Sequence, residues 1–270
     1  VFIFVFALGI RGAAIATVLS QTLSAAFVLY FLRKKTELKV CLLSRKEIRN
    51  CWDRAKNIIS LGTAGFIMQL TNSLVTICCN NVLSVTGGDL YISVMTIVSS
   101  IRQIIDTPIH AITEGSSPVI SYNYGARRPK RVFQSWLTMS VMAILYTLFA
   151  WGVILFAPRF LIGIFSSDQA LITDAIPALK LYFGAFIFQA LQYVGQTMFK
   201  SLGKKKFAIF FSLLRKVIIV VPLTYIFPYL FHMGSDGVFL AEPVSNVLGG
   251  SACFIVMLCT VMPELKRMAK

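Results

Sequence analysis

The chain has 270 residues, of which 57% are hydrophobic and only 14% are charged, and its mean hydropathy is +0.76. Soluble domains contain about 25% charged residues, so this composition excludes an ordinary soluble enzyme or binding domain and indicates a membrane protein. The net charge of +15 would suggest nucleic acid as a partner, but the basic residues cluster in short segments between apolar blocks, which argues against nucleic acid.

Seven apolar blocks are long enough to cross the hydrocarbon core as helices of about 20 residues. Bounded by Gly, Pro and charge, they lie at 13–32, 57–83, 92–124, 132–156, 175–199, 207–230 and 238–262. The chain begins inside a further apolar run at 1–6, so we expect it to be a fragment of a longer protein. The block at 92–124 exceeds a bilayer, so we expect it to tilt, to extend past the membrane or to break near Pro108 or Pro118.

The first span opens with a sequence pattern that returns in the last span. GIRGAAIATVLSQ at 9–21 and GSDGVFLAEPVSN at 234–246 share glycine, alanine, serine and amide positions. Six spans separate the copies, and an even number returns the second copy to the same orientation, which predicts two parallel repeats with solute bound between them. Chance similarity between two membrane helices is the alternative explanation.

The segment 33–56 is the longest polar connection. It is basic, with an amphipathic pattern around Ile48 and Trp52, and we predict a cytoplasmic linker that lies on the membrane surface. A dedicated lipid-binding helix is the alternative.

Basic residues occur in alternate connections along the chain. Of the 26 Lys and Arg, 20 lie in 33–56, 127–131, 200–206 and 266–270. The other connections, 84–91, 157–174 and 231–237, contain one basic residue and four aspartates. This positive-inside pattern predicts a multi-pass protein of the inner or plasma membrane with a cytoplasmic C-terminus.

The third span carries ionisable residues at every fourth position, namely Arg102, Asp106, His110 and Glu114. That spacing places them along one helical face, and ionisable groups in hydrocarbon are functional candidates because each costs at least about 2.5–3.5 kcal/mol. Arg102 and Asp106, near mid-membrane, are either a structural pair or a coupling site. A histidine and a glutamate one turn apart could carry a proton, since histidine titrates near neutral pH.

Two further spans carry neutral polar stripes. The second span has Gln69, Asn72, Thr76 and Asn80, and the fifth has Gln189, Gln192 and Gln196. Such residues either hold helices together by hydrogen bonds or line a wet cavity, and we favour the cavity because two helices share the pattern.

The last two spans add three charged residues. Arg215 and Lys216 lie near the cytoplasmic end of the sixth span, where their side chains either snorkel to the interface or have a functional role. Glu242 precedes Pro243, which frees a backbone carbonyl of the helix. A carboxylate beside a broken helix is a candidate cation site. The alternative is a carboxylate that is merely hydrated, because it lies near the external surface.

These residues resemble the multidrug and toxic-compound extrusion (MATE) family. The resemblance rests on the stretches GIRGAAIATVLSQ (9–21), EGSSPVISYNYGARRPKRV (114–132), FIFQALQYVGQTMFKSLGK (186–204), SLLRKVIIVVPLTY (212–225) and GSDGVFLAEPVSN (234–246). It implies an all-α integral membrane fold, a fragment of a twelve-helix transporter. Residues 1–32 would end the N-terminal lobe, 33–56 would link the lobes, 57–262 would form the six-helix C-terminal lobe, and 263–270 a cytoplasmic tail.

The resemblance also implies a secondary antiporter that exports amphipathic, cationic drugs in exchange for H⁺ or Na⁺ by rocking of two lobes, without a cofactor, resident metal or catalytic residue. Its partners would be the substrate, the bilayer and the missing N-terminal lobe. This chain departs from the family pattern at Asn72 and Asn246, where members often carry acids, and at Glu242, where many carry glutamine. Coupling would then rest on acids of the missing lobe or on Asp106, Glu114 and Glu242.

Other functions fit the sequence less well. A flippase for lipid-linked oligosaccharides, from the same superfamily, would be expected to have a strongly cationic cavity, whereas Arg102 is offset by Asp106. A membrane enzyme is not indicated, because H-E-x-x-H, G-x-S-x-G and paired catalytic carboxylates are missing from the sequence. The six cysteines show no C-x-x-C or metal-binding spacing and are predicted to be apolar packing residues.

Overall fold

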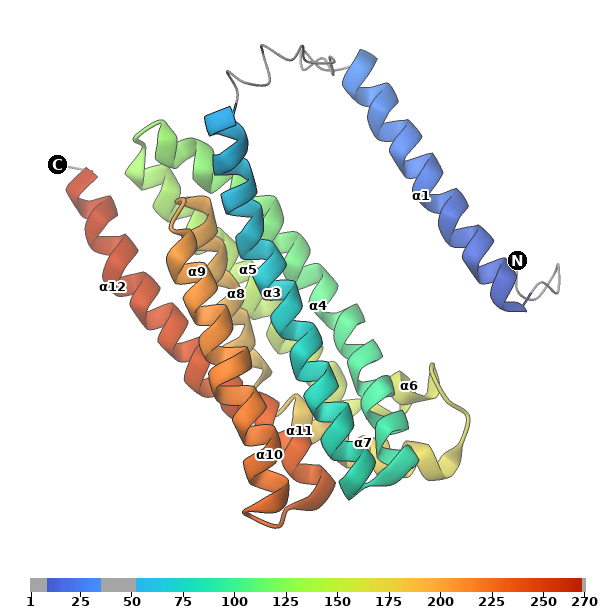
Figure 1. Ribbon diagram of the computed structural model, residues 1–270. Coiled ribbons are helices and arrows are strands. Elements are labelled where there is room, and N and C mark those ends of the chain that lie inside the picture. Colours follow the sequence, from blue (N-terminus) through green and yellow to red (C-terminus); the bar gives the residue numbers. More distant parts are fainter. Residues whose placement is uncertain (1–8, 35–51, 269–270) are drawn as a thin grey trace. The chain divides into compact units, whose positions relative to one another are not determined.

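The computed structural model describes residues 9–34 and 52–268. The chain divides into two units, residues 1–57 and 58–270, and each is described by itself. In the described ranges every regular element is a helix (Figure 1), so the predicted all-α fold is confirmed. Residues 1–6 and most of the predicted linker 33–56 lie outside the described residues, as do Cys41 and Cys51.

The first unit contains helix α1 (Gly9–Lys34). Its large apolar side chains are exposed, with Leu23 at 70% and Phe27 at 68%, and its last turn carries Arg33 and Lys34. An exposed apolar segment that ends in basic residues, such as the second half of α1, is typical of a helix in contact with lipid.

Three long helices open the second unit: α3 (Trp52–Thr86), α4 (Gly88–Gly125) and α5 (Pro129–Phe156). A tight turn joins α3 to α4, where Gly88 has a φ of +65°, a conformation that glycine adopts without a steric penalty. Helix α4 continues through Pro108 and Pro118 without interruption. Of the outcomes expected for the 92–124 block, the break near a proline does not occur.

The fifth predicted span differs from a single helix. After the short α6 (Pro158–Gly163), the chain forms α7 (Gln169–Tyr182) and α8 (Phe186–Ser201), which are bent by 51° at the break between them. The predicted block 175–199 is therefore wrong as one straight helix. Gly184 lies in this break and Pro177 lies within α7, so the sequence carried two helix-breaking residues that the apolar block length did not take into account.

The last two spans each contain a π-helical segment. One comprises α9 (Lys205–Leu213), η1 (Leu214–Val220) and α10 (Val221–Tyr229). The other comprises α11 (Gly234–Ser245), η2 (Asn246–Gly250) and α12 (Ser251–Met268). Pro243 lies just before η2 and lacks the N–H that a regular helix needs, which favours a local change of helical pitch.

Both copies of the sequence repeat begin a helix. Gly9 starts α1 and Gly234 starts α11, and the two glycines have φ values of +50° and +57°. A positive φ is strained for other residues. The first glycine of the repeat thus adopts the same left-handed backbone conformation in both copies.

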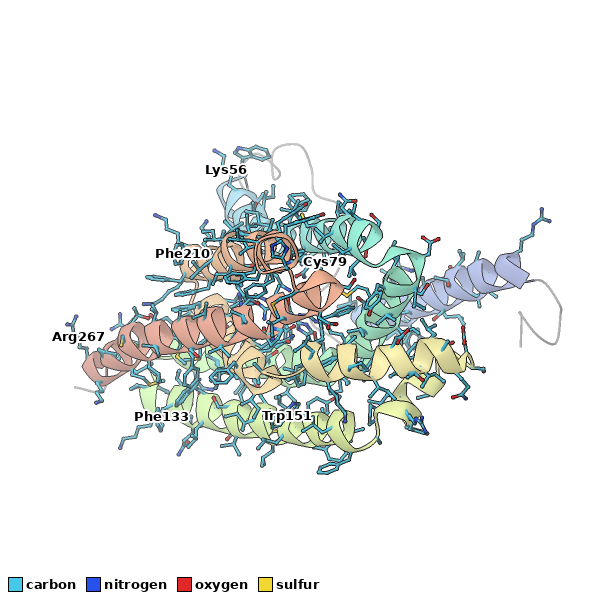
Figure 2. The ribbon with its side chains drawn as sticks, turned by 90° about the horizontal axis from the view of Figure 1, so that it is seen from below. Lys56, Cys79, Phe133, Trp151, Phe210 and Arg267 are labelled. Carbon is cyan, nitrogen blue, oxygen red and sulfur yellow. The ribbon has the colours of Figure 1, made fainter. Side chains whose placement is uncertain are left out.

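Within residues 9–34 and 52–268, five helices are long and apolar enough to cross a membrane, or six if the bent pair α7 and α8 is one span. Helix α4, which carries the ionisable stripe, does not meet that criterion, although the predicted block 92–124 lies within it. Within the second unit, α8 packs against α4, α5 and α12. Buried aromatic residues such as Phe183, Phe186 and Phe199 fill the interior, while Phe133, Phe210 and Arg267 lie on the outside of the bundle (Figure 2).

Candidate functional site

A cavity of about 670 Å³ in the second unit is lined by residues of α3, α4, α7, α8, α9, η1 and α11. It brings together side chains from segments that are remote in sequence. Ten of the fourteen residues predicted for the site line it, namely Gln69, Asn72, Thr76, Arg102, Asp106, His110, Gln192, Gln196, Arg215 and Glu242.

The buried carboxylate of Glu242 is the centre of one wall. Its Oε1 lies 2.8 Å from Nη2 of Arg102, 3.2 Å from Nη2 of Arg215 and 3.2 Å from Nζ of Lys216. Glu242 is only 3% exposed, so neither water nor salt screens these ion pairs strongly. Three cations from α4 and η1 therefore share one carboxylate oxygen of α11.

Asp106 organises a second group of polar side chains next to the first. Its Oδ2 accepts hydrogen bonds from Nε of Arg102 at 3.2 Å, from Nε2 of Gln189 at 3.1 Å and from the hydroxyl of Tyr193 at 3.2 Å. Arg102 also donates to the hydroxyl of Tyr182. Arg102 thus joins both carboxylates, and buried polar groups in such a network hold one another in place.

The close approach of η1 and η2 depends on glycine. A Cβ atom on Gly249 would lie 2.8 Å from Cγ of Arg215, and one on Gly250 would overlap the carbonyl oxygen of Phe188. Because these positions have no side chain, Arg215 can lie against η2 and donate to Oδ1 of Asn246. Asn246 does not line the cavity but orients a residue that does.

Arg215 and Lys216 do not snorkel. They are 3% and 7% exposed, and both pair with Glu242, so their charges are met inside the bundle. Glu242 is likewise 3% exposed, so its carboxylate is met by these cations and not at the external surface.

The remaining predicted residues lie at the edge of the cavity or outside its lining. Glu114 is exposed and pairs with Lys200, a lining residue, at 2.9 Å. His110 packs its ring against Tyr193 at a centroid distance of 4.6 Å. Asn80 is exposed and does not line the cavity. Gln189 does not line it either, but donates to two lining residues, Asp106 and Tyr193.

Three participants were not among the predicted site residues: Lys216, Tyr182 and Tyr193. Lys216 was visible as an intramembrane charge beside Arg215, and Tyr193 lies one turn after Gln189 on the polar stripe. Tyr182 gives no signal in the sequence, because it precedes the bend between α7 and α8 that directs it toward Arg102.

Two buried polar atoms of the lining have no hydrogen-bond partner in the described part of the chain. They are Nε of Arg215 and Oε1 of Gln192. Buried polar atoms are normally paired, so these two are exceptions within the wall of the cavity. Arrangements of this kind bind small molecules by a few polar contacts within a concave site.

Known proteins resemble this chain along most of its length. The family model described as MatE matches residues 65–226. The Multidrug export protein MepA of Staphylococcus saprophyticus is 24% identical over 260 residues, which covers 95% of this chain and 55% of MepA. The chain therefore spans about half the length of such relatives.

Solved structures share the fold. A crystal structure of MATE in complex with MaL6 superposes with a TM-score of 0.84 at 24% identity, covering 98% of this chain and 59% of the other. A transporter of the MOP superfamily from Pyrococcus furiosus, for which a binding pocket of reverse polarity is described, superposes with a TM-score of 0.82 at 22% identity, covering 100% of this chain and 59% of the other.

Proposed function

This chain belongs to the MatE family, and from that premise we propose that it is the C-terminal part of a multi-pass secondary antiporter that exports amphipathic, cationic drugs or xenobiotics in exchange for H⁺ or Na⁺. Its relative MepA is a multidrug export protein. We further propose that residues 1–32 end an N-terminal lobe and that 57–262 form the C-terminal lobe. Rocking of the two lobes would then expose the site to each side in turn.

The observation that carries the proposal is the polar cavity within an apolar bundle. Gln69, Asn72 and Thr76 of α3 line it and are themselves exposed. Two other walls carry buried charges held in fixed positions. The site thus has one side of exposed polar groups and another side on which buried charges are held in place. Such a site suits a carrier that binds its solute between two lobes near the middle of the membrane.

Among the three acids considered for coupling, Asp106 is the one that we propose exchanges a cation. Glu242 already has three cationic partners, and Glu114 is exposed beside Lys200. Asp106 has one cationic partner, Arg102, which it shares with Glu242, and its other partners are neutral. The net attraction of a proton or Na⁺ is therefore greatest at Asp106.

The test is ethidium efflux from cells that express the intact protein, with the Na⁺ and proton gradients collapsed separately. We expect Asp106→Asn to lower gradient-driven efflux at least about tenfold, the equivalent of roughly 1.4 kcal/mol. Glu114→Gln, a matched acid-to-amide exchange at an exposed pair, is expected to change it less than about twofold. Efflux that Asp106→Asn leaves intact would remove Asp106 from the coupling role, and no gradient-dependent efflux by the native protein would refute the antiporter.

A flippase of lipid-linked oligosaccharides is the second candidate, because three basic side chains converge on one point of the cavity. Glu242 and Asp106 offset two of these three positive charges, so the wall lacks the strongly cationic character expected of a site for a pyrophosphate carrier. Competition between ethidium and an isoprenyl pyrophosphate for binding to the purified protein separates the two candidates. Tight binding of the pyrophosphate with no effect of ethidium would favour the flippase.

A further inference from the structure

The charged wall of the cavity carries one positive charge more than its acids neutralise. Arg102, Arg215 and Lys216 bring three positive charges, and Asp106 and Glu242 bring two negative ones. Lys200, which also lines the cavity, is paired with Glu114. Among the described lining residues, no acidic side chain therefore compensates the one excess positive charge.

The excess is concentrated on η1. Arg102 directs each of its three nitrogens to a partner, namely Asp106, Glu242 and Tyr182. Arg215, 3% exposed, leaves its Nε without an acceptor in the described residues. The Lys216 ammonium has three N–H donors and shares with two arginines the one carboxylate oxygen to which it donates.

We propose that Lys216 and Arg215 bind an anionic group in this cavity, either a carboxylate of the transported molecule or a small inorganic anion. Such a group would neutralise the wall and accept a hydrogen bond from the Lys216 ammonium, which has donors beyond the one that it directs to Glu242. Charge-assisted hydrogen bonds of this kind are about twice as strong as neutral ones. The proposal goes beyond the export function, and equilibrium binding tests it without any transport.

This site assigns a chemical class to the substrates. A purely cationic molecule gains nothing from the wall of Lys216 and Arg215 and can occupy only the neutral side formed by Gln69, Asn72 and Thr76. A molecule that carries a carboxylate, alone or together with a cationic amine, can occupy both sides. Zwitterionic and anionic amphipathic compounds are therefore expected to bind better than the corresponding amides, in which an uncharged amide replaces the carboxylate.

The experiment is titration calorimetry on the intact, detergent-purified protein in chloride-free buffer. Benzoate should bind saturably and benzamide, its uncharged analogue, should not. Benzoate binding that chloride fails to displace identifies a substrate carboxylate as the ligand, whereas displacement by chloride identifies a small inorganic anion. If neither benzoate nor chloride binds saturably, the proposal is overturned.

Charge variants give opposite signs of effect. Lys216→Met leaves the wall neutral and should weaken benzoate binding at least about tenfold, whereas Glu242→Gln adds a positive charge and should strengthen it by a similar factor. The double variant Lys216→Met, Glu242→Gln restores the original net charge and should bind within about threefold of the native protein.

The matched control is Glu264→Gln, an acid-to-amide exchange at the pair of Glu264 with Lys204, which does not line the cavity. It should leave benzoate affinity unchanged. Thermal melting of each variant establishes whether it folds. If Glu242→Gln does not fold, the benzoate affinities of Lys216→Met and of the double variant still test the proposed site. Benzoate affinity that Lys216→Met does not lower would refute the site.

Discussion

The Glu242 carboxylate joins three segments of the bundle, because its partners lie on α4 and on η1 while it belongs to α11. Ion pairs buried this completely are weak evidence for stability as a whole, because desolvation offsets much of their attraction. Removal of one partner is different, since it leaves the others as uncompensated buried charges.

We therefore expect Glu242→Gln to destabilise the intact protein by about 3–5 kcal/mol. Glu264→Gln removes a partly exposed partner of Lys204 and Tyr124 and should cost less than about 1 kcal/mol. Thermal unfolding of the two variants in the same detergent measures the difference. Equal melting temperatures would show that the cations around Glu242 find other partners.

The identity of most site residues was predictable, but their pairing was not. Arg102, Asp106 and Glu242 stand out in the sequence because charge inside hydrocarbon is costly. Glu242 is far along the chain from Arg102, and nothing in the spacing of either span shows that their side chains meet. The burial of Arg215 and Lys216 depends on η1 and η2 lying together, so periodicity could not distinguish it from snorkelling.

At the level of helices, apolar block length was a reliable guide because a helix must bury its backbone polar groups internally in lipid. Apart from residue 230 and the break at 183–185, the seven predicted blocks fall within helices or within consecutive helical segments of one span. The bend between α7 and α8 and the two π-helical segments were missed. Gly184 and Pro243 are local signs of two of them, but the close packing between helices, such as Gly250 against Phe188, could not be predicted from the local sequence.

Gly250→Ala tests the packing of η2 against α8. The added methyl group would overlap the backbone carbonyl of Phe188, which cannot rotate away, so we expect a loss of about 1–3 kcal/mol of stability from overpacking. Gly152→Ala in α5 is the matched control, because a Cβ atom there meets nothing within 4 Å. It should be neutral or stabilising by up to about 1 kcal/mol. A stable Gly250→Ala variant would mean that η2 and α8 can separate.

For the whole molecule, the loop charges predict which turns share a side of the membrane. Single cysteines in place of Arg127 and Lys206 should react with an impermeant thiol reagent only from the cytoplasmic side. Cysteines in place of Asp168 and Asp236 should react only from outside. Labelling is measured in intact cells and in inverted vesicles, after replacement of the native cysteines by serine. If Arg127 and Asp236 were labelled from the same side, the proposed topology would be wrong.

The π-helical segments have a consequence for how the sequence of this protein can change in evolution. A π turn holds one more residue than an α turn, and each residue of an α-helix advances about 100° around the axis. A single-codon deletion within η1 would thus be absorbed by conversion of the π turn into an α turn, and Tyr225 and the later side chains of that span would keep their faces. Sequence alignments that penalise gaps within spans would therefore misplace relatives that lack the extra residue.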